Sequence, residues 1–393
     1  MDLKEKGFST KSVRSGEKRD PETGAIITPI YETSVFGFSS TKELIDVMSK
    51  KTEGYVYTRF DNPTLRAVEK KMAELENGGD AAVFSSGMAA ITITVLTLVN
   101  SGDHIISARD LYGGTLKFFT DILPRFGIDV SLVQAIDSSH MKPAIQKNTK
   151  IIYFETLTNP TLKYSDMSEI ANIGKKNGIT VVVDNTFASP YNIKPIQFGI
   201  DIVIHSATKY LGGHNDLTAG IAISSEAFIQ KLKEMRKHLG GTLDPMAAWL
   251  LLRGLKTLGL RMERHNQSGM QVAEYLEKHP KVKKVHYPGL TSHPSHSIAV
   301  QQMKGFGGVV SFEIDGDFEK TMRFVESLEL CILAPSLGGA ETLATQPVTS
   351  SHYFVDEESR LRAGITDQLV RLALGIEDPQ DIISDLEQAF EKI

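Results

Sequence analysis

Lys209 is the residue whose neighbours most clearly favour covalent chemistry. It lies in the segment HSATKYLGGHND, just after a short apolar run, with hydroxyl groups at Ser206 and Thr208 beside it and a glycine pair at 212–213. A lysine taken at random is usually a solvated surface charge. A lysine amine can also form an imine with an aldehyde, while hydroxyl and backbone N–H groups bind phosphate. The segment therefore suits an aldehyde cofactor that carries a phosphate group.

Asp184 is a second candidate group, at the end of the apolar run Thr180–Val183. Such an aspartate can simply cap a helix or close a turn. It can also present its carboxylate at the carboxyl edge of a sheet, where open α/β folds bind their ligands. Taken alone, the residue leaves both interpretations open.

Ser86, Gly87 and Met88 form a turn between the apolar run 81–84 and the apolar segment 89–99. If that segment is a helix, the backbone N–H groups at its start point toward an anion. Turns of small residues between a strand and a helix also occur without ligands, so this feature is weak on its own.

The elements that must position these groups are buried strands separated by helices. Seven apolar runs have the length of strands; they are 81–84, 104–108, 129–133, 151–154, 180–183, 202–204 and 219–223. Strands that alternate with helices predict a largely parallel sheet. The stretch between 204 and 219 is too short for a helical crossover, so an antiparallel neighbour is expected there.

The chain divides into three expected regions. Residues 1–60 are rich in Gly, Pro, Ser and Thr and predict an extended arm. Residues 61–254 would form a cofactor-binding domain, which begins with a helix that ends at Gly78-Gly79. Residues 255–393 predict a smaller α+β domain, with strands at 282–286 and 309–314 and helices near 319–328 and 378–391.

Composition excludes several classes of protein. The 393 residues carry a formal charge of −5 without a basic block, which makes nucleic acid a poor partner. A single cysteine, Cys331, excludes a Cys-based zinc cluster and an intrachain disulfide, and no metal site is expected. Residues 1–14 lack the apolar stretch of a secretory signal, and the segment 89–99 is too short to span a membrane. A cytoplasmic protein is expected.

The motifs together resemble the Cys/Met metabolism family of pyridoxal-phosphate (PLP) enzymes. HSATKYLGGHND and VVDNTFASP match its cofactor segment, and the likeness continues through YTRFDNPT, FSSGMAA, DLYGGT, ETLTNPT, SLGGAETLATQP and LVRLALGIED. The family includes cystathionine γ-lyases, cystathionine γ-synthases and methionine γ-lyases. The resemblance implies the type I PLP transferase fold, with a mostly parallel central sheet, helices on both faces and a smaller C-terminal α+β domain.

The resemblance also implies PLP as cofactor, held by Lys209, which would later serve as a base. Asp184 would pair with the ring nitrogen. Tyr112 would stack on the ring and act as acid or base, with a structural core tyrosine as the alternative. The phosphate would bind to Ser86, Gly87, Met88, Ser206 and Thr208.

The same resemblance assigns residues to the substrate and to a partner subunit. Arg371, charged among apolar neighbours, would bind the substrate α-carboxylate, unless it forms an internal ion pair. Asn159 would approach the phenolic oxygen of the cofactor or the substrate carboxylate, and Ser336 would orient the substrate. Tyr57 and Arg59 would reach the phosphate of a neighbouring subunit, which implies a homodimer with shared sites and a tetramer of two dimers.

The choice of substrate rests on three positions. Methionine γ-lyases commonly have a cysteine where this chain has Gly114. Glu341 matches a glutamate that would bind the distal amino group of cystathionine or cysteine in relatives. Lys117 stands where cystathionine-handling relatives often have a cationic residue, with a solvated helix residue as the alternative. A cystathionine γ-lyase or γ-synthase type is therefore favoured, with methionine γ-lyase and O-acetylhomoserine sulfhydrylase as alternatives. Asp61 departs from the family motif, where small residues are usual, and the sequence offers no account of it.

Two other classes of protein remain possible on these motifs. One is a non-catalytic regulatory or binding protein on the same fold, which would not need to keep the set Lys209, Asp184, Tyr112 and Arg371. The other is an ordinary nucleotide binder, which would need a GxGxxG motif or a P-loop after the first strands, and the sequence has neither there.

Overall fold

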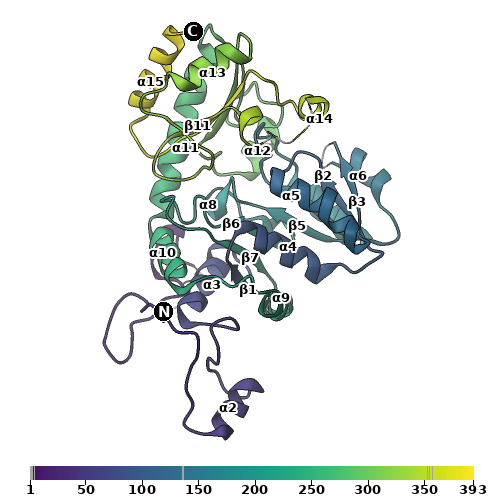
Figure 1. Ribbon diagram of the computed structural model, residues 1–393, viewed down its shortest axis with the longest axis vertical. Coiled ribbons are helices and arrows are strands. Elements are labelled where there is room, and N and C mark those ends of the chain that lie inside the picture. Colours follow the sequence, from purple (N-terminus) through teal and green to yellow (C-terminus); the bar gives the residue numbers. More distant parts are fainter. Residues whose placement is uncertain (1–2, 4, 135–136, 352, 354, 356) are drawn as a thin grey trace.

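Seven short strands form the central sheet of the protein (Figure 1). In the computed structural model, which describes residues 3, 5–134, 137–351, 353, 355 and 357–393, the strand order is β1-β7-β6-β5-β4-β2-β3. The bounds are β1 (Asp80–Phe84), β2 (His104–Ala108), β3 (Asp129–Val133), β4 (Thr149–Glu155), β5 (Thr180–Asp184), β6 (Ile202–Ser206) and β7 (Gly220–Ser224). All seven predicted strands are confirmed.

β7 is the antiparallel member of this sheet. It pairs antiparallel with β1 and β6, whereas β2, β3, β4, β5 and β6 pair in parallel. The chain between β6 and β7 contains turns and no helix, so it reverses direction instead of crossing over. The expected antiparallel neighbour is thus confirmed.

Helices lie on both faces of the central sheet, because residues on opposite faces of β7 contact different helical segments. A Cβ atom at Gly220 would lie 2.9 Å from Cβ of Ala90 in α4, whereas Ile223 points to the opposite face, toward Gly78 after α3. The helices of this region are α3 (Pro63–Glu76), α4 (Gly87–Leu98), α5 (Gly113–Lys117), η1 (Phe118–Ile122), η2 (Leu123–Phe126), α6 (Ser138–Ala144), α7 (Met167–Asn177), α8 (Ser189–Asn192), η3 (Pro195–Phe198), α9 (Glu226–Leu239) and α10 (Pro245–Lys256).

α3 begins and ends on local signals. The side chain of Asn62 caps its N-terminus by accepting from the backbone N–H of Thr64, and Pro63 occupies the first turn. Its end differs slightly from the prediction, because Asn77, with φ of 59°, takes the left-handed conformation one residue before the glycine pair. Asparagine adopts that conformation at modest cost, which allows the helix to stop there.

The N-terminal arm carries two helices that the sequence did not predict. α1 (Phe8–Arg14) packs against α3, α10 and α11, and buries Lys11 and Ser12. α2 (Thr41–Met48) lies on the part of the arm that extends away from both sheets (Figure 1). Short polar helices such as α1 depend on tertiary packing more than on local propensity, which explains why the composition of this region gave no signal.

A second sheet follows α11 (Leu258–Lys278). Its order is β10-β11-β12-β9-β8, with bounds β8 (Val282–His286), β9 (Val309–Ile314), β10 (Ile332–Leu333), β11 (Leu343–Thr345) and β12 (Leu369–Ala373). Its helices are α12 (His296–Gln302), α13 (Phe318–Glu326), η4 (Pro347–Thr349), α14 (Glu357–Arg362) and α15 (Pro379–Glu391). The predictions of β8, β9, α13 and α15 are confirmed, while β10, β11 and β12 were not anticipated.

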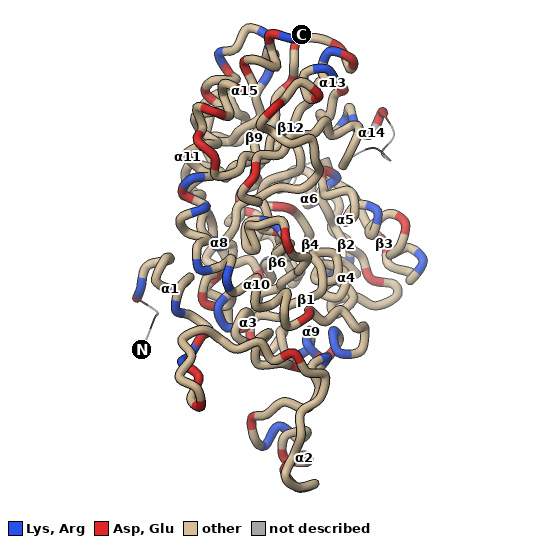
Figure 2. Tube along the Cα trace, turned by 60° about the vertical axis from the view of Figure 1, so that its left-hand side comes forward, with Lys and Arg blue, Asp and Glu red and all other residues tan. Residues whose placement is uncertain are grey.

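The two sheets occupy separate stretches of the chain, β1–β7 before residue 225 and β8–β12 after residue 281. A division at residues 60 and 254 remains a proposal. Basic and acidic residues are interspersed along the described chain (Figure 2). Within the described ranges, no helix is long and apolar enough to cross a membrane, and no group of three or more His, Cys, Asp and Glu residues could hold a metal ion.

Candidate active site

A cavity of about 1340 Å³ lies where the carboxyl ends of β4, β5 and β6 face the second sheet. Ligands of open α/β folds bind at this edge of the sheet. Twelve of the predicted site residues line it; they are Ser86, Gly87, Met88, Tyr112, Lys117, Asn159, Asp184, Ser206, Thr208, Lys209, Ser336 and Arg371. The fold therefore brings together groups from seven separate motifs.

Lys209 lies in the turn that follows β6. Its backbone N–H donates to the carbonyl of Ser206 at 3.2 Å, and its Nζ atom donates to Oγ of Ser336 at 2.6 Å. Burial, with a smaller effect from the charge of Arg371, lowers the pKa of the lysine amine to about 8. A larger fraction of this amine than of an ordinary lysine is therefore uncharged near neutral pH, and the uncharged amine is the form that reacts with an aldehyde.

Arg371 is a buried cation on β12, 4% exposed. Nη1 donates to Oδ1 of Asn159 at 3.0 Å and Nη2 to the carbonyl of Ser336 at 2.9 Å, while Nε is buried without a hydrogen-bond partner. These partners are neutral oxygens, and the internal ion pair considered from the sequence is not formed with any residue that the structure describes. Burial lowers the pKa of Arg371 to about 10, so the guanidinium stays charged and can bind a carboxylate.

Asp184 and Glu155 lie side by side at the ends of β5 and β4, where the strand register pairs them directly. The backbone N–H of Thr186 donates to Oδ1 of Asp184 at 2.9 Å, and the Thr186 hydroxyl donates to the same atom. Burial raises the pKa of Asp184, which is a poorly solvated carboxyl that a cationic ring nitrogen would stabilise in its charged form.

Tyr112 precedes α5, and its side chain is 49% exposed, which rules out the alternative of a core tyrosine. Its backbone N–H donates to Oε1 of Glu155 at 2.6 Å. Its ring lies close to Gly114, because a Cβ atom there would be only 2.7 Å from Cε1 of Tyr112 and 3.2 Å from the sulfur of Met88. The absence of a side chain at 114 thus makes room for the tyrosine ring in this position.

The turn at 86–88 has the features of an anion site. Ser86 caps α4, its Oγ accepting from the N–H of Ala89 at 3.1 Å, which leaves the first N–H groups of the helix pointing out of its end. A Cβ atom at Gly87 would lie 2.9 Å from Cβ of Ser206, so only glycine lets α4 approach β6 this closely. Ser206 and Thr208 also line the cavity, and Oγ of Ser206 would lie 3.0 Å from a Cβ atom at Gly87.

These groups fit PLP. The helix end with two hydroxyls suits its phosphate, the poorly solvated Asp184 suits its ring nitrogen, and the Lys209 amine suits its aldehyde.

Three predicted residues lie outside the cavity of their own chain: Tyr57, Arg59 and Glu341. Arg59 donates from Nη1 to the carbonyl of Lys237 at 2.6 Å, and its guanidinium lies 5.5 Å from the ring centroid of Tyr57. Glu341 is exposed and accepts from Nδ2 of Asn215 at 2.9 Å. Lys117 is also exposed, but it lines the cavity.

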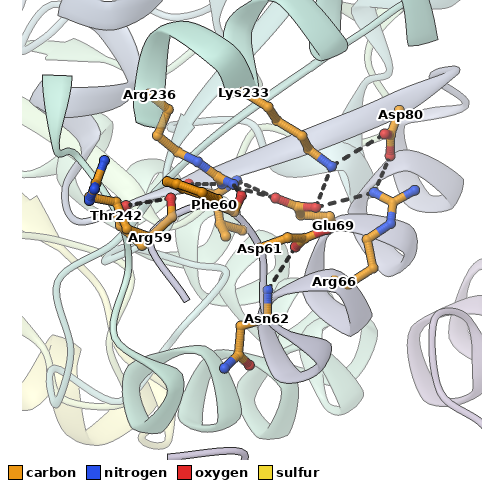
Figure 3. A network of polar contacts seen from close by, with 11 residues as sticks. Arg59, Phe60, Asp61, Asn62, Arg66, Glu69, Asp80, Lys233, Arg236 and Thr242 are labelled. Carbon is orange, nitrogen blue, oxygen red and sulfur yellow. Dashed lines mark hydrogen bonds and ion pairs between the residues drawn. The ribbon is translucent and has the colours of Figure 1, made fainter. Parts of the chain in front are cut away.

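A buried ionic network holds the arm where it joins α3 (Figure 3). Glu69 accepts from Arg236 at 3.0 Å and from Lys233 at 2.5 Å, and Arg66 contacts it at 3.1 Å. Arg236 also donates from Nη2 to the carbonyl of Phe60 at 3.2 Å. The network thereby fixes the backbone next to Arg59.

Asp61 accepts from the N–H of Asn62 at 2.9 Å. Burial, and to a smaller extent the charge of Glu69, raises the pKa of Asp61.

Sequence analysis missed Glu155 and Thr186, both in the cavity wall. Glu155 ends the apolar run 151–154 just as Asp184 ends the run 180–183, so the same signal could have identified it. Thr186 could not be found in this way, because threonines after strands are common in turns.

Comparisons with known proteins agree with this geometry. The protein family described as "Cys/Met metabolism PLP-dependent enzyme" matches residues 9–391 of this chain. An L-methionine gamma-lyase of Fusobacterium nucleatum subsp. nucleatum is 43% identical, with 100% of each chain covered. A chloroplastic cystathionine gamma-synthase 1 of Arabidopsis thaliana is 44% identical, covering 97% of this chain and 68% of its own. The solved structure of cystathionine gamma-lyase from Lactobacillus plantarum is 40% identical, with a TM-score of 0.93 over 98% of this chain and 99% of its own. The chain therefore belongs to the Cys/Met metabolism family of PLP-dependent enzymes.

Proposed function

We propose that this enzyme breaks or forms the bond between the γ-carbon and the sulfur of an amino-acid substrate, as cystathionine γ-lyases and γ-synthases do. The observation that carries this proposal is that the half-buried Lys209 amine and the buried Arg371 guanidinium both donate to Ser336 in one cavity. A carboxylate bound to Arg371 would bring the adjacent α-carbon of an amino acid toward the Lys209 amine.

The cofactor would be held by the residues named from the sequence. Asp184 would pair with the ring nitrogen, Tyr112 would stack on the ring, and Asn159 would approach its phenolic oxygen or the substrate carboxylate. The phosphate would bind the start of α4 at Ser86, Gly87 and Met88, with Ser206 and Thr208. When bound, PLP supplies the electron sink that stabilises negative charge on the substrate carbons.

The residues of this chain would handle the protons. Lys209, once free of the cofactor, would take the proton from the α-carbon, since its lowered pKa makes it an effective base near neutrality. Tyr112, which lines the same cavity, would manage protons at the leaving sulfur. Arg371 would orient the substrate with two parallel N–H groups, and Ser336 would keep the amine and the guanidinium apart.

We also propose that two subunits share each site. Tyr57 and Arg59 are positioned outside their own cavity on an arm that exposes large apolar side chains, such as Ile26 at 84% and Val35 at 61%. An apolar surface of this kind favours contact with another protein surface. A second copy would then receive Tyr57 and Arg59 at its phosphate, and two such dimers would form a tetramer.

Three positions favour cystathionine over methionine as substrate. Gly114 replaces the cysteine common in methionine γ-lyases, and a side chain there would displace the ring of Tyr112. Lys117 lines the cavity and would bind a distal carboxylate. Glu341, which lies outside the cavity of its own chain, would bind a distal amino group. Methionine γ-lyase is the second candidate, favoured by the Fusobacterium relative, which matches over both whole chains.

The test is a product assay on the PLP-loaded protein with cystathionine, with methionine, and with O-activated homoserine plus cysteine or sulfide. Turnover or synthesis of cystathionine that Lys209→Ala abolishes would support the proposal. Methanethiol from methionine alone would favour the second candidate, and homocysteine from sulfide would indicate an O-acetylhomoserine sulfhydrylase. The absence of every product would leave a non-catalytic member of the family.

A further inference from the structure

Glu155 is a second buried carboxyl of the active site that no role has yet explained. It ends β4, is 7% exposed, lines the cavity and faces Asp184 across the strand pair. Its Oε1 atom accepts the backbone N–H of Tyr112 at 2.6 Å. One side chain thus contacts the loop of the stacking tyrosine and neighbours the carboxyl that would bind the ring nitrogen.

The charged groups around this pair do not neutralise two carboxylates. His205, behind Asp184, pairs with Glu76 at 2.6 Å, and Lys163 pairs with Asp110 at 2.7 Å. Lys209 and Arg371 donate to Ser336 instead. Asp110 and Tyr153 also interact with Glu155, and neither supplies a positive charge. Ionising both carboxyls would place two like charges side by side with no cation between them, so one of them keeps a proton.

The contacts decide which carboxyl is charged. Asp184 receives two hydrogen bonds from Thr186 and interacts electrostatically with His205. These interactions favour its ionised form. Glu155 receives backbone N–H groups but faces the charges of Asp184 and Asp110. Burial, then the charge of Asp184, raises the pKa of Glu155 well above its ordinary value.

We propose that Glu155 is a positioning residue that stays protonated at neutral pH, so that Asp184 alone carries the negative charge for the ring nitrogen while Oε1 of Glu155 fixes the Tyr112 turn. This inference rests on the proposed role of Asp184. A neutral carboxyl still accepts through its carbonyl oxygen, so one group can hold the tyrosine loop without competing for the ring nitrogen.

The state of the proton can be observed without any substrate. Infrared spectroscopy of the wild-type protein at neutral pH should show the C=O stretch of a buried, protonated carboxyl group. Glu155→Gln should remove that band, whereas Glu329→Gln, at an exposed position, should leave it. A difference spectrum of wild type minus Glu155→Gln that lacks this band would overturn the proposal.

The positioning role predicts an asymmetry between two variants in PLP binding by equilibrium dialysis. Glu155→Gln keeps a neutral acceptor, so its Kd for PLP should remain within about threefold of wild type, while Glu155→Ala, which leaves the Tyr112 N–H unpaired, should weaken binding by about tenfold or more. Equal losses in both variants would mean that the charge of Glu155 is needed, which contradicts the proposal. Asp184→Asn tests the role of Asp184 separately from that of Glu155. If this variant does not weaken PLP binding, the role proposed for Asp184 fails, whatever the Glu155 variants do.

Discussion

The Nζ atom of Lys209 donates a hydrogen bond to Oγ of Ser336 at 2.6 Å, which links the central sheet to the second one. The carbonyl of Ser336 accepts from Arg371, so this one residue separates the amine from the guanidinium. Ser336 has a φ of 105°, a strained value for a residue with a side chain. Strain of this kind is typical of functional sites, where the surrounding contacts impose it.

Arg371→Lys should raise KM for the amino-acid substrate by about 10- to 100-fold, with a smaller effect on kcat, because lysine cannot form two parallel hydrogen bonds with a carboxylate. Steady-state kinetics measures both constants. Arg264→Lys, at a partly exposed position, is the matched control and should leave them unchanged. An unchanged KM in Arg371→Lys would exclude Arg371 as the carboxylate site.

Lys209 in the cofactor-free protein should react with amine reagents in a pH-dependent manner, with a midpoint near its pKa of about 8. Burial disfavours the charged amine, so the reactive neutral form grows as the pH rises through that value, well below the range of an ordinary lysine. Peptide mapping after pulse labelling gives the rate at Lys209 and at an exposed lysine such as Lys392 in the same sample. Identical pH profiles at both lysines would contradict this prediction.

Arg59→Ala and Lys209→Ala should each abolish or strongly reduce activity alone, yet recover activity when the two inactive proteins are mixed and reassociated. If Arg59 serves the partner's site, a hybrid dimer carries one site with both defects and one intact site. Random mixing should therefore restore about a quarter of the wild-type activity. The measurement is specific activity after unfolding and refolding the mixture. No recovery, with hybrids confirmed by mass spectrometry, would place Arg59 in its own subunit's site.

Most of the central sheet could be predicted because each of its strands is a short apolar run with a clear end. β12 could not be predicted, because Arg371 interrupts its apolar pattern. The charged residue was interpreted as part of a ligand site and not as part of a strand. α1 was missed because its helical state depends on packing against α3 and α11, which local sequence does not encode.

Glu69→Gln should destabilise the protein by about 3 to 5 kcal/mol, because it leaves Arg236 and Lys233 buried with a neutral partner. Burial by itself would raise the pKa of Glu69, but the positive charges of Lys233, Arg236 and Arg66 outweigh it and lower the pKa to about 2. The charged group therefore stabilises the folded state above the ordinary carboxyl pKa, and this contribution is lost as the pH falls toward 2. Urea denaturation at fixed protein concentration should show that the difference in unfolding free energy between wild type and Glu69→Gln narrows as the pH falls toward 2.

Glu234→Gln is the control for Glu69, since Glu234 forms an exposed pair with Lys237 and should change stability by less than about 1 kcal/mol. A Glu69→Gln protein as stable as this control would show that the network does not anchor the arm.

The residues of the candidate site could be named from the sequence, because binding a cofactor and a substrate restricts the residue types at a site. Lys209, Asp184 and Arg371 lie far apart in the sequence and meet in one cavity. The locations of Tyr57 and Arg59 relative to that cavity could not be derived from one chain, since they depend on where the arm lies. Glu155 was overlooked because its strand was recognised only for its apolar residues.

The most direct test of this account is to treat the PLP-loaded protein with borohydride, which makes a lysine–cofactor linkage permanent, and to map the modified peptide by mass spectrometry. The account predicts one cofactor per chain, attached to Lys209 and absent from Lys209→Ala. Attachment at another lysine, or none at all, would contradict it.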